Sequence, residues 1–348
     1  MKTSAVIALV LWIGLLPVQA QDNESSQVRK KREGLKAYNQ AVEYVQKADY
    51  LSALPKLNQV VEMDARNTNA LLLRGKVKYE LKDMNGAVTD FTKTLELDPQ
   101  NGEAFFNRGL TKFRRDSSLE AVNDLNQAIA MNYTRAEVYY YRGIIKMLKR
   151  DYSGAILDFT FAIDKRPGYA LALHERGSAR RMVNDLQGAI YDYRQALALD
   201  PKLKLAWNNM GQVKTQLGDY QNAVADFTEA INLDNTFFQA YNNRGESHFQ
   251  LGEYQAAMED FNAAVLINDK YIPALNNLGN AKCKLENLTS AMDDYNKIIS
   301  LDPSFGPAYL NRGYVKEQLG DLEGACADWK KADALGVKNA GLYLKECK

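Results

Sequence analysis

A phrase of the sequence returns at a fixed spacing of 34 residues, and this spacing restricts the possible folds more than any other feature. The stretch NNMGQVKTQLGDYQNAVADF at 208–227 is followed by NNRGESHFQLGEYQAAMEDF at 242–261. Aligned on the glycine of this phrase, nine ungapped units run over 34–67, 68–101, 102–135, 136–169, 170–203, 204–237, 238–271, 272–305 and 306–339. Such a period predicts a repeat architecture in which each unit buries its apolar face only against its neighbours.

Within a unit, numbered from its first residue, the same positions carry the same kinds of side chain. Position 8 is glycine in every unit except the first, where Ala41 stands, and position 20 is always alanine. Position 24 is large, as in Phe227 and Trp329. Positions 4, 7, 8 and 11 share one helical face, as do 20, 24, 27 and 28, so each unit is predicted to hold two amphipathic helices. Phrases such as LGD separate the two helices, and proline at position 32 ends the second in four units.

This pattern over 34–339 resembles the tetratricopeptide repeat family, because small residues stand at positions 8 and 20 and large ones at positions 4 and 24. The resemblance implies an all-α fold: a right-handed superhelical α-solenoid of nine 34-residue helix-turn-helix repeats with a C-terminal capping helix. It also implies that the first helices line a concave surface and the second helices a convex one.

A charged pair repeats with the same period. Position 7 is arginine in six units, as in Arg244, and position 23 is aspartate in eight, as in Asp260. A catalytic or phosphate-binding role is the alternative, but sites do not recur in every unit. We therefore expect salt bridges between paired helices, which are optional because Met210 and Leu278 replace the arginine in two units.

The first twenty residues differ from the rest of the chain. Lys2 precedes the apolar run AVIALVLWIGLL at 5–16, and Val18 and Ala20 are small enough for cleavage before Gln21. This pattern is typical of a secretory signal peptide over 1–20. An uncleaved membrane anchor is the alternative, although the run is shorter than the ~20 residues that span a bilayer. Residues 21–33 are predicted to form a polar and basic linker.

The end of the chain carries two of the three cysteines. The phrase GACADWKKADALG and the closing YLKEC resemble the ending of exported repeat proteins from Bacteroidetes-type bacteria. This resemblance, together with the oxidising compartment that a secreted chain meets, suggests a disulfide between Cys326 and Cys347; two buried free thiols are the alternative. In the capping segment 340–348, the apolar residues 342–344 are expected to cover the open face of the last unit.

Nothing in the sequence indicates catalysis. The two histidines, His174 and His248, lie in different units without a partner at metal-ligand spacing, and no nucleophile, zinc or phosphate-loop motif is present. The array leaves no segment long enough for a catalytic domain. A formal net charge of +1 gives no field that would attract nucleic acid. We therefore predict no enzyme activity, catalytic residue, metal, cofactor, small-molecule substrate or nucleic-acid partner.

The concave face is the surface that this reasoning leaves for function. In the family, positions 2, 5, 9, 12 and 13 often face ligands, and here they are largely apolar in the first four units and largely neutral amides in units six to eight. The implied partner-binding residues are Tyr79, Phe106, Leu110, Phe113, Tyr140, Ile144 and Met147, then Asn208, Asn242, Asn276 and Asn280. The alternative is that positions 5, 9 and 12 pack against the neighbouring first helix.

These features together predict a non-enzymatic scaffold that binds a peptide or helix of a partner protein in the concave groove. Export predicts a periplasmic or outer-membrane-associated location as part of an envelope complex, or secretion if the protein is not retained. Two alternatives stay open. One is an adaptor that binds glycan or cell wall through the amide-rich half, and the other is a docking subunit of a separate envelope enzyme.

Overall fold

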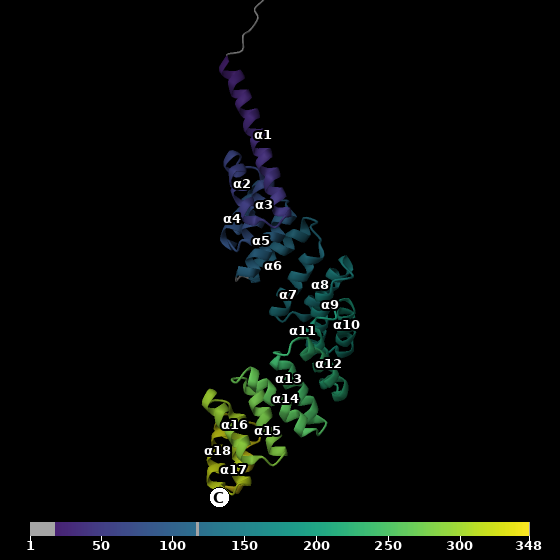
Figure 1. Cartoon of the computed structure of the whole chain (residues 1–348), viewed down its shortest axis with the longest axis vertical. Helices are drawn as coiled ribbons and strands as arrows, with labels where there is room; N and C mark the ends of the chain where they lie inside the picture. The colour runs from purple at the N-terminus through teal and green to yellow at the C-terminus, as the bar shows by residue number, and fades with distance from the viewer. Residues whose placement is uncertain (1–17, 116–117, 348) are drawn as a thin grey trace, which may run out of the picture. The chain divides into compact units, whose positions relative to one another are not determined.

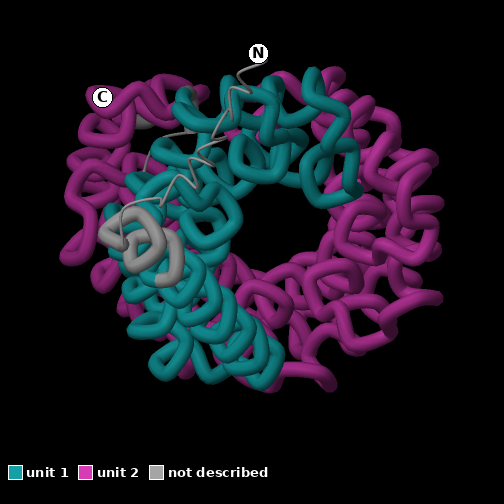
Figure 2. Tube along the Cα trace, turned by 90° about the horizontal axis from the view of Figure 1, so that it is seen from above, with its two compact units in different colours: residues 1–145 teal, residues 146–348 magenta. Residues whose placement is uncertain are grey.

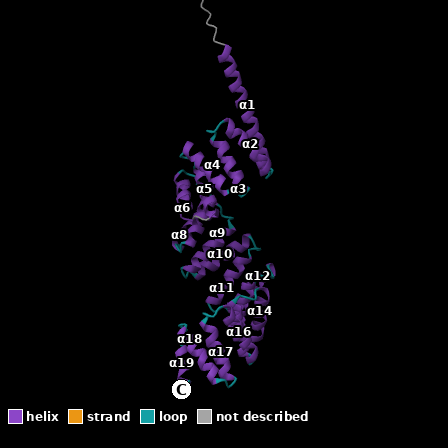
Figure 3. Ribbon diagram, turned by 90° about the vertical axis from the view of Figure 1, so that its left-hand side faces the viewer, coloured by secondary structure: helices purple, strands orange, loops and turns teal. Residues whose placement is uncertain are grey.

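The computed structural model describes residues 18–115 and 118–347, and this part of the chain is helical throughout, without a strand (Figure 3). Successive helices are joined by short turns, and α1 to α18 are labelled in Figure 1. Their bounds are α1 (Val18–Gln46), α2 (Tyr50–Met63), α3 (Thr68–Glu80), α4 (Met84–Leu97), α5 (Gly102–Arg115), α6 (Ser118–Ala130), α7 (Ala136–Leu148), α8 (Tyr152–Lys165), α9 (Ala170–Met182), α10 (Leu186–Leu199), α11 (Lys204–Gln216), α12 (Tyr220–Leu233), α13 (Phe238–Gln250), α14 (Tyr254–Ile267), α15 (Ile272–Lys284), α16 (Leu288–Leu301), α17 (Gly306–Gln318), α18 (Leu322–Ala334), α19 (Ala340–Tyr343) and the 3-10 turn η1 (Leu344–Glu346).

The chain divides into two compact units, residues 1–145 and 146–348, which Figure 2 shows in different colours. Within unit 1, each helix from α1 to α6 packs on the next, and α3 also contacts α5. Within unit 2, each helix from α8 to α18 packs on the next, and the first helices α9, α11, α13, α15 and α17 contact one another in order. The predicted α-solenoid of stacked helix pairs is thereby confirmed.

The turn inside each pair is set by its last two residues. Asp321 begins α18 by accepting a hydrogen bond from the backbone N–H of Gly324 at 2.8 Å, and this Asp cap recurs before α4, α8 and α10. The residue before the cap has a positive φ, +86° at Gly320, which glycine adopts without a steric penalty. Arg150 occupies the same place with φ +61°. The LGD phrase at 319–321 is therefore a left-handed turn followed by a helix cap, whereas at 217–219 the left-handed turn at Gly218 is present and Asp219 makes no side-chain cap bond.

The small and large positions of the repeat form the core between paired helices. Every position-20 alanine has no exposed surface, and Phe227 and Trp329 at position 24 are equally buried. The ring at position 24 lies directly over the glycine at position 8. A Cβ on Gly211 would stand 2.7 Å from Cε1 of Phe227, so the helices approach this closely only because the glycine has no side chain.

The predicted ion pairs join the two helices of a repeat. Arg244 donates from Nε and Nη2 to the two carboxylate oxygens of Asp260 at 2.9 and 2.7 Å. The same two bonds are present in Arg74–Asp90, Arg108–Asp124, Arg176–Asp192 and Arg312–Asp328. The predicted salt bridges between paired helices are thereby confirmed.

The sequence reasoning missed a second cation, which reaches the same aspartate from position 11 of the first helix. Where position 7 lacks arginine, this lysine is the cation bonded to the carboxylate: Lys214 Nζ lies 2.6 Å from Asp226, and Lys282 Nζ lies 2.6 Å from Asp294. Burial raises the pKa of both carboxyl groups above the ordinary aspartate value.

The N-terminal helix corrects one expectation. The linker predicted at 21–33 is not a separate segment, because α1 runs through it into the first repeat without interruption. The segment has good helix formers and no glycine or proline, and Arg29 Nε bonds Glu33 Oε1 one turn later at 3.1 Å. Residues 1–17, most of the predicted signal peptide, lie outside the described residues. Among the described residues, we find no helix with the length and apolar character needed to cross a bilayer.

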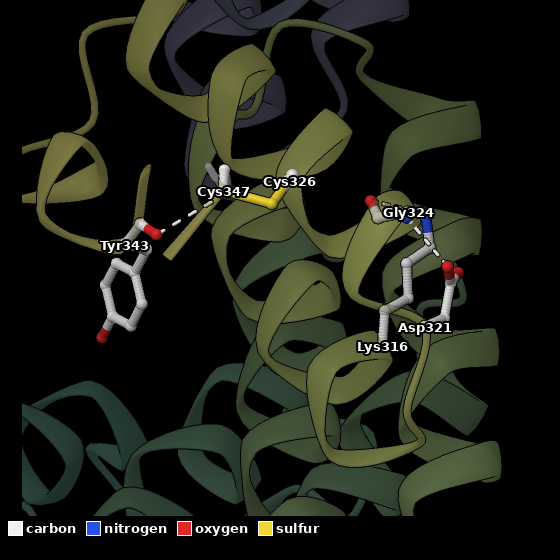
Figure 4. Close-up of a disulfide and its surroundings, with 6 residues drawn as sticks. All are labelled: Lys316, Asp321, Gly324, Cys326, Tyr343 and Cys347. Carbon is white, nitrogen blue, oxygen red and sulfur yellow. Dashed lines mark hydrogen bonds between the residues drawn. A yellow bond between two sulfur atoms is a disulfide. The ribbon is translucent and has the colours of Figure 1, made fainter. Parts of the chain in front are cut away.

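At the other end, a disulfide between Cys326 and Cys347 joins α18 to the final residues (Figure 4). The ring of Tyr343 lies 5.2 Å from that of Trp329, so this side chain covers the last repeat. Leu342 does not do so, contrary to expectation, since 58% of its surface is exposed. The four-residue helix α19 has one covering face, and Leu342 lies outside it.

Candidate partner-binding surfaces

The first helices of unit 1 form an apolar pocket. A pocket of about 270 Å³ lies between α1, α3 and α5, and Val45, Tyr79 and Leu110 line it together with Lys76 and Glu80. Burial raises the pKa of the Tyr79 hydroxyl, which therefore stays protonated at neutral pH. The structure thus brings together two of the predicted partner-binding residues, Tyr79 and Leu110.

The aromatic residues predicted beside them behave differently. Phe106 is only 9% exposed and packs in the core of unit 1, with its ring 5.6 Å from Tyr133 and 6.4 Å from Tyr141. Phe113 also lies against Tyr141, with the rings 6.3 Å apart. The ring of Phe106 therefore packs between neighbouring first helices, which is the alternative that the sequence left open.

The other predicted apolar residues lie on α7. The Tyr140 ring stands edge-on to Tyr141 at 5.3 Å, and Tyr140 and Ile144 are half-buried. Met147 is also half-buried and belongs to unit 2. These three residues retain accessible surface.

The first helices of unit 2 are linked by hydrogen bonds between asparagine side chains, here called the amide row. Three bonds from Nδ2 to Oδ1 connect consecutive repeats: Asn243 to Asn208 at 3.0 Å, Asn277 to Asn242 at 3.1 Å, and Asn311 to Asn276 at 3.0 Å. A fourth contact, from Asn209 Nδ2 to His174 Nε2 at 3.1 Å, begins the row. In these three bonds the side-chain oxygens of Asn208, Asn242 and Asn276 accept, so the row joins consecutive first helices through their amides.

The structure places two of the predicted asparagines inside the amide row. Asn208 and Asn242 are each 5% exposed, and their side-chain oxygens accept the bonds that join neighbouring first helices. Asn276 and Asn280 are half-buried. The donors at position 6 were missed, although the sequence signals them: the NN doublets at 208–209, 242–243 and 276–277 place an amide at both positions 5 and 6.

Two adjoining pockets open beside the row and are here called the α15 groove. One of about 160 Å³ is lined by residues of α13 and α15, and another of about 230 Å³ reaches α17. Both are lined by Phe249 and Asn280, and Tyr314, 45% exposed, forms the far side of the second. The groove therefore has aromatic sides and an amide at its centre. Of the predicted polar residues, only Asn280 lines it.

The two histidines and the acidic side chains beside them are involved in contacts within the protein. No group of histidine, cysteine and acidic side chains that could hold a metal ion is found among the described residues. His248 Nδ1 lies 2.5 Å from Glu253, and its Nε2 lies 3.8 Å from Asp260, where other repeats place lysine. His174 Nε2 contacts Asn209 at the start of the amide row. Both histidines thus have structural partners, and the chemistry of these surfaces is hydrogen bonding and apolar contact.

Comparison with known proteins agrees with this architecture. Family models described as TPR repeat match residues 177–218 and 211–252, and models described as tetratricopeptide repeat match 38–102, 238–271 and 272–305. Together these ranges cover more than half of the chain. No curated protein matches it.

Several solved structures are similar in fold. A tetratricopeptide repeat protein from Parabacteroides merdae is 19% identical, with a TM-score of 0.55 over 71% of this chain and 98% of that one. MamA is 29% identical, with a TM-score of 0.44 over 47% of this chain and 96% of that one. YrrB, described as a TPR protein with an unusual peptide-binding site, is 22% identical, with a TM-score of 0.47 over 54% of this chain and 97% of that one. With the helix pairs, the period and the matching family models, the chain belongs to the tetratricopeptide repeat family.

Proposed function

We propose that the chain is a non-enzymatic scaffold that binds an extended peptide segment of a partner protein along the first helices of unit 2. The observation that carries this proposal is the α15 groove, whose two pockets share Phe249 and Asn280. A shallow surface with aromatic sides and neutral amides suits a peptide, because the rings cover apolar side chains and the amides bond the backbone.

Rigidity supports this proposal. The amide row and the ion pairs join each repeat to the next or hold its two helices together, so the groove exists before a partner arrives. A preformed surface loses little conformational entropy on binding, and more of the contact energy remains as affinity. Neutral amides also bond a peptide backbone without selecting for its charge. The charged residues of the groove are Glu246 in one pocket and Lys284 in the other.

The pocket between α1, α3 and α5 supports a second contact within the same function. Its apolar residues Val45, Tyr79 and Leu110 suit a large apolar side chain of a partner. Lys76, on its wall, is bonded to Glu103 at 2.6 Å, and Glu80 is the acidic residue that lines the pocket.

We also propose that the protein acts outside the cytoplasm, in the cell envelope. The disulfide between Cys326 and Cys347 suits an oxidising compartment, and the sequence of residues 1–20 has the pattern of a secretory signal. N-terminal sequencing of the protein recovered from its cell envelope or medium should begin at Gln21. An intact Met1 would mean that the segment is retained.

The test of peptide binding uses the mature chain and a displayed library of random linear peptides. A length of about 12 residues is ample, since ~6 extended residues at ~3.3 Å each span two steps of ~10 Å between helices. Enriched peptides are synthesised and their Kd is measured by fluorescence anisotropy. We expect Phe249→Ala with Tyr314→Ala to weaken binding at least about tenfold, as aromatic anchors do.

The matched control is Tyr191→Ala, which removes an aromatic side chain 59% exposed on the second helix α10. Its affinity should equal that of the original chain. If the variant with both Phe249→Ala and Tyr314→Ala binds the peptide as tightly as the original chain, the peptide binds outside the α15 groove. No enriched peptide, together with saturable binding of cell-wall polysaccharide, would favour the glycan adaptor instead.

A further inference from the structure

Asn280 lies at the centre of the α15 groove and lines both of its pockets. Its Oδ1 accepts two hydrogen bonds, from the Tyr295 hydroxyl at 2.8 Å and from Asn311 Nδ2 at 3.1 Å. No residue among those described accepts a hydrogen bond from its Nδ2. The carboxamide therefore turns its oxygen toward the protein and leaves its NH₂ group for the groove.

A network of amides alone would not fix this direction. If the Asn280, Asn311 and Asn276 amides were all rotated by a half-turn, each oxygen would exchange places with a nitrogen and the same contacts would form with donors and acceptors reversed. A hydroxyl breaks this equivalence because it has one hydrogen to donate. In the rotated arrangement the Tyr295 hydrogen would face an NH₂ group, and its remaining neighbour would be the Cys283 sulfur at 3.8 Å.

Tyr295 is well held for this task. It is 1% exposed, and its ring lies over Gly279, where a Cβ would stand 2.7 Å from the ring. Burial raises the pKa of its hydroxyl, which therefore remains a donor throughout the physiological range. Burial also raises the pKa of the Cys283 thiol, so that the S–H group can donate to the hydroxyl oxygen.

We propose, resting on the peptide-binding function above, that Tyr295 is a positioning residue that sets the direction of this network. It holds the NH₂ group of Asn280 toward the α15 groove as a donor for one backbone carbonyl oxygen of the bound peptide. The same position then disfavours a ligand N–H group, because two donors would face each other. Selectivity of the groove for the register of the peptide follows from this one fixed amide.

The repeat provides both the substitution and its control. Position 24 is phenylalanine in other repeats, including Phe227 and Phe261, so Tyr295→Phe fits the slot. Tyr193 is the other tyrosine at this position within unit 2, is fully buried, and meets Ser178 Oγ at 3.2 Å. Tyr193→Phe therefore removes a buried hydroxyl and its hydrogen bond without changing Asn280.

The binding test uses a peptide enriched on the original chain and analogues in which one backbone amide at a time is replaced by an ester, which weakens the preceding carbonyl as an acceptor. On the original chain, we expect one ester position that weakens binding by about five- to tenfold, the loss expected from one neutral hydrogen bond. On Tyr295→Phe the unmodified peptide should bind several-fold weaker and this ester should have little further effect. Tyr193→Phe should behave as the original chain.

A merely structural role for Tyr295 would lower stability but leave the ester sensitivity in place, and that result would overturn the proposal. Equal binding of all peptides by Tyr295→Phe and the original chain would overturn it as well.

A second measurement needs no peptide, so its outcome is separate from that of the proposed function. In protein labelled with ¹⁵N in asparagine, the side-chain NH₂ signals of Asn280 are those lost in Asn280→Asp. In the original chain and in Tyr193→Phe, we expect one pair of Asn280 NH₂ signals that exchanges rapidly with solvent. In Tyr295→Phe, we expect an additional pair of Asn280 NH₂ signals, which comes from the rotated network. Slow exchange of the Asn280 NH₂ in the original chain would mean that it bonds inside the protein and would refute the proposal.

Discussion

Removing one donor of the amide row tests whether this row stabilises unit 2. In Asn243→Ala, the Asn208 carbonyl oxygen loses the donor that lies 3.0 Å away, and Asn208 is too buried, at 5% exposure, to be rehydrated freely. An unpaired buried acceptor costs about 1–3 kcal/mol. The weaker contact from Asn242 Nδ2 to Asn243 Oδ1 at 3.4 Å is lost as well. We therefore expect a loss of about 2 kcal/mol in the free energy of unfolding.

The assay is urea unfolding followed by far-UV circular dichroism, with Asn39→Ala as the control. Asn39 stands at the same position of the first repeat but is exposed, so its replacement should change the free energy of unfolding by less than about 0.5 kcal/mol. If Asn243→Ala unfolds at the same urea concentration as the control variant, the row contributes nothing and the reasoning fails.

A double-mutant cycle sharpens the same prediction. Asn208→Ala with Asn243→Ala removes acceptor and donor together, and no unpaired group remains. The loss for the pair should be smaller than the sum of the single losses by about 1 kcal/mol. Strict additivity would show that the two amides do not interact in solution.

Four further predictions follow from the packing. Phe106→Ser should lower the free energy of unfolding by at least about 3 kcal/mol, seen in urea unfolding, because it empties core space between first helices. Arg150→Gly should raise it by about 0.5–1 kcal/mol in the same assay, because glycine relieves the positive φ. The raised pKa of Asp294 means that this carboxyl group binds a proton more firmly in the folded protein than in the unfolded chain. The free energy of unfolding should therefore fall as pH rises from about 4 through the raised pKa. Asp294→Asn should reduce this dependence on pH, measured by urea unfolding at several pH values. Reducing the bond between Cys326 and Cys347, which closes a loop of 21 residues, should lower the stability of the last repeat by about 3 kcal/mol, measured by hydrogen exchange in α18.

The repeating part of this fold could be predicted from sequence because each rule is applied many times. A single glycine near a large side chain says little, but a glycine at position 8 opposite a ring at position 24 in repeat after repeat defines a helix crossing, as Gly211 and Phe227 show. The same holds for Arg244 and Asp260. The segment 21–33 lies outside the period, and there polarity suggested a linker although the residues favour a helix.

The candidate surfaces were harder to predict, because the same face of a first helix both packs against the next first helix and borders the pockets. Positions 5 and 9 of a first helix lie between that helix and the next one, and side-chain size decides whether the residue fills this space or borders it. Phe106 fills it, whereas Leu110 at position 9 borders a pocket. Neither outcome is visible in composition, since both residues are apolar and belong to the same helix.

Asparagine at these positions adds a further choice, which only the neighbouring repeat can decide. An amide has donors and an acceptor, so a row of asparagines satisfies itself whenever positions 5 and 6 of consecutive repeats both carry one, as Asn208 and Asn243 do. A ligand can then be bonded only where the row has a group to spare. Asn280 is such a place, because its oxygen is held by Tyr295 and Asn311 and its nitrogen is not. The amide that we propose as the ligand donor is thus distinguished less by its own identity than by the hydrogen bond from a tyrosine fifteen residues further along the chain.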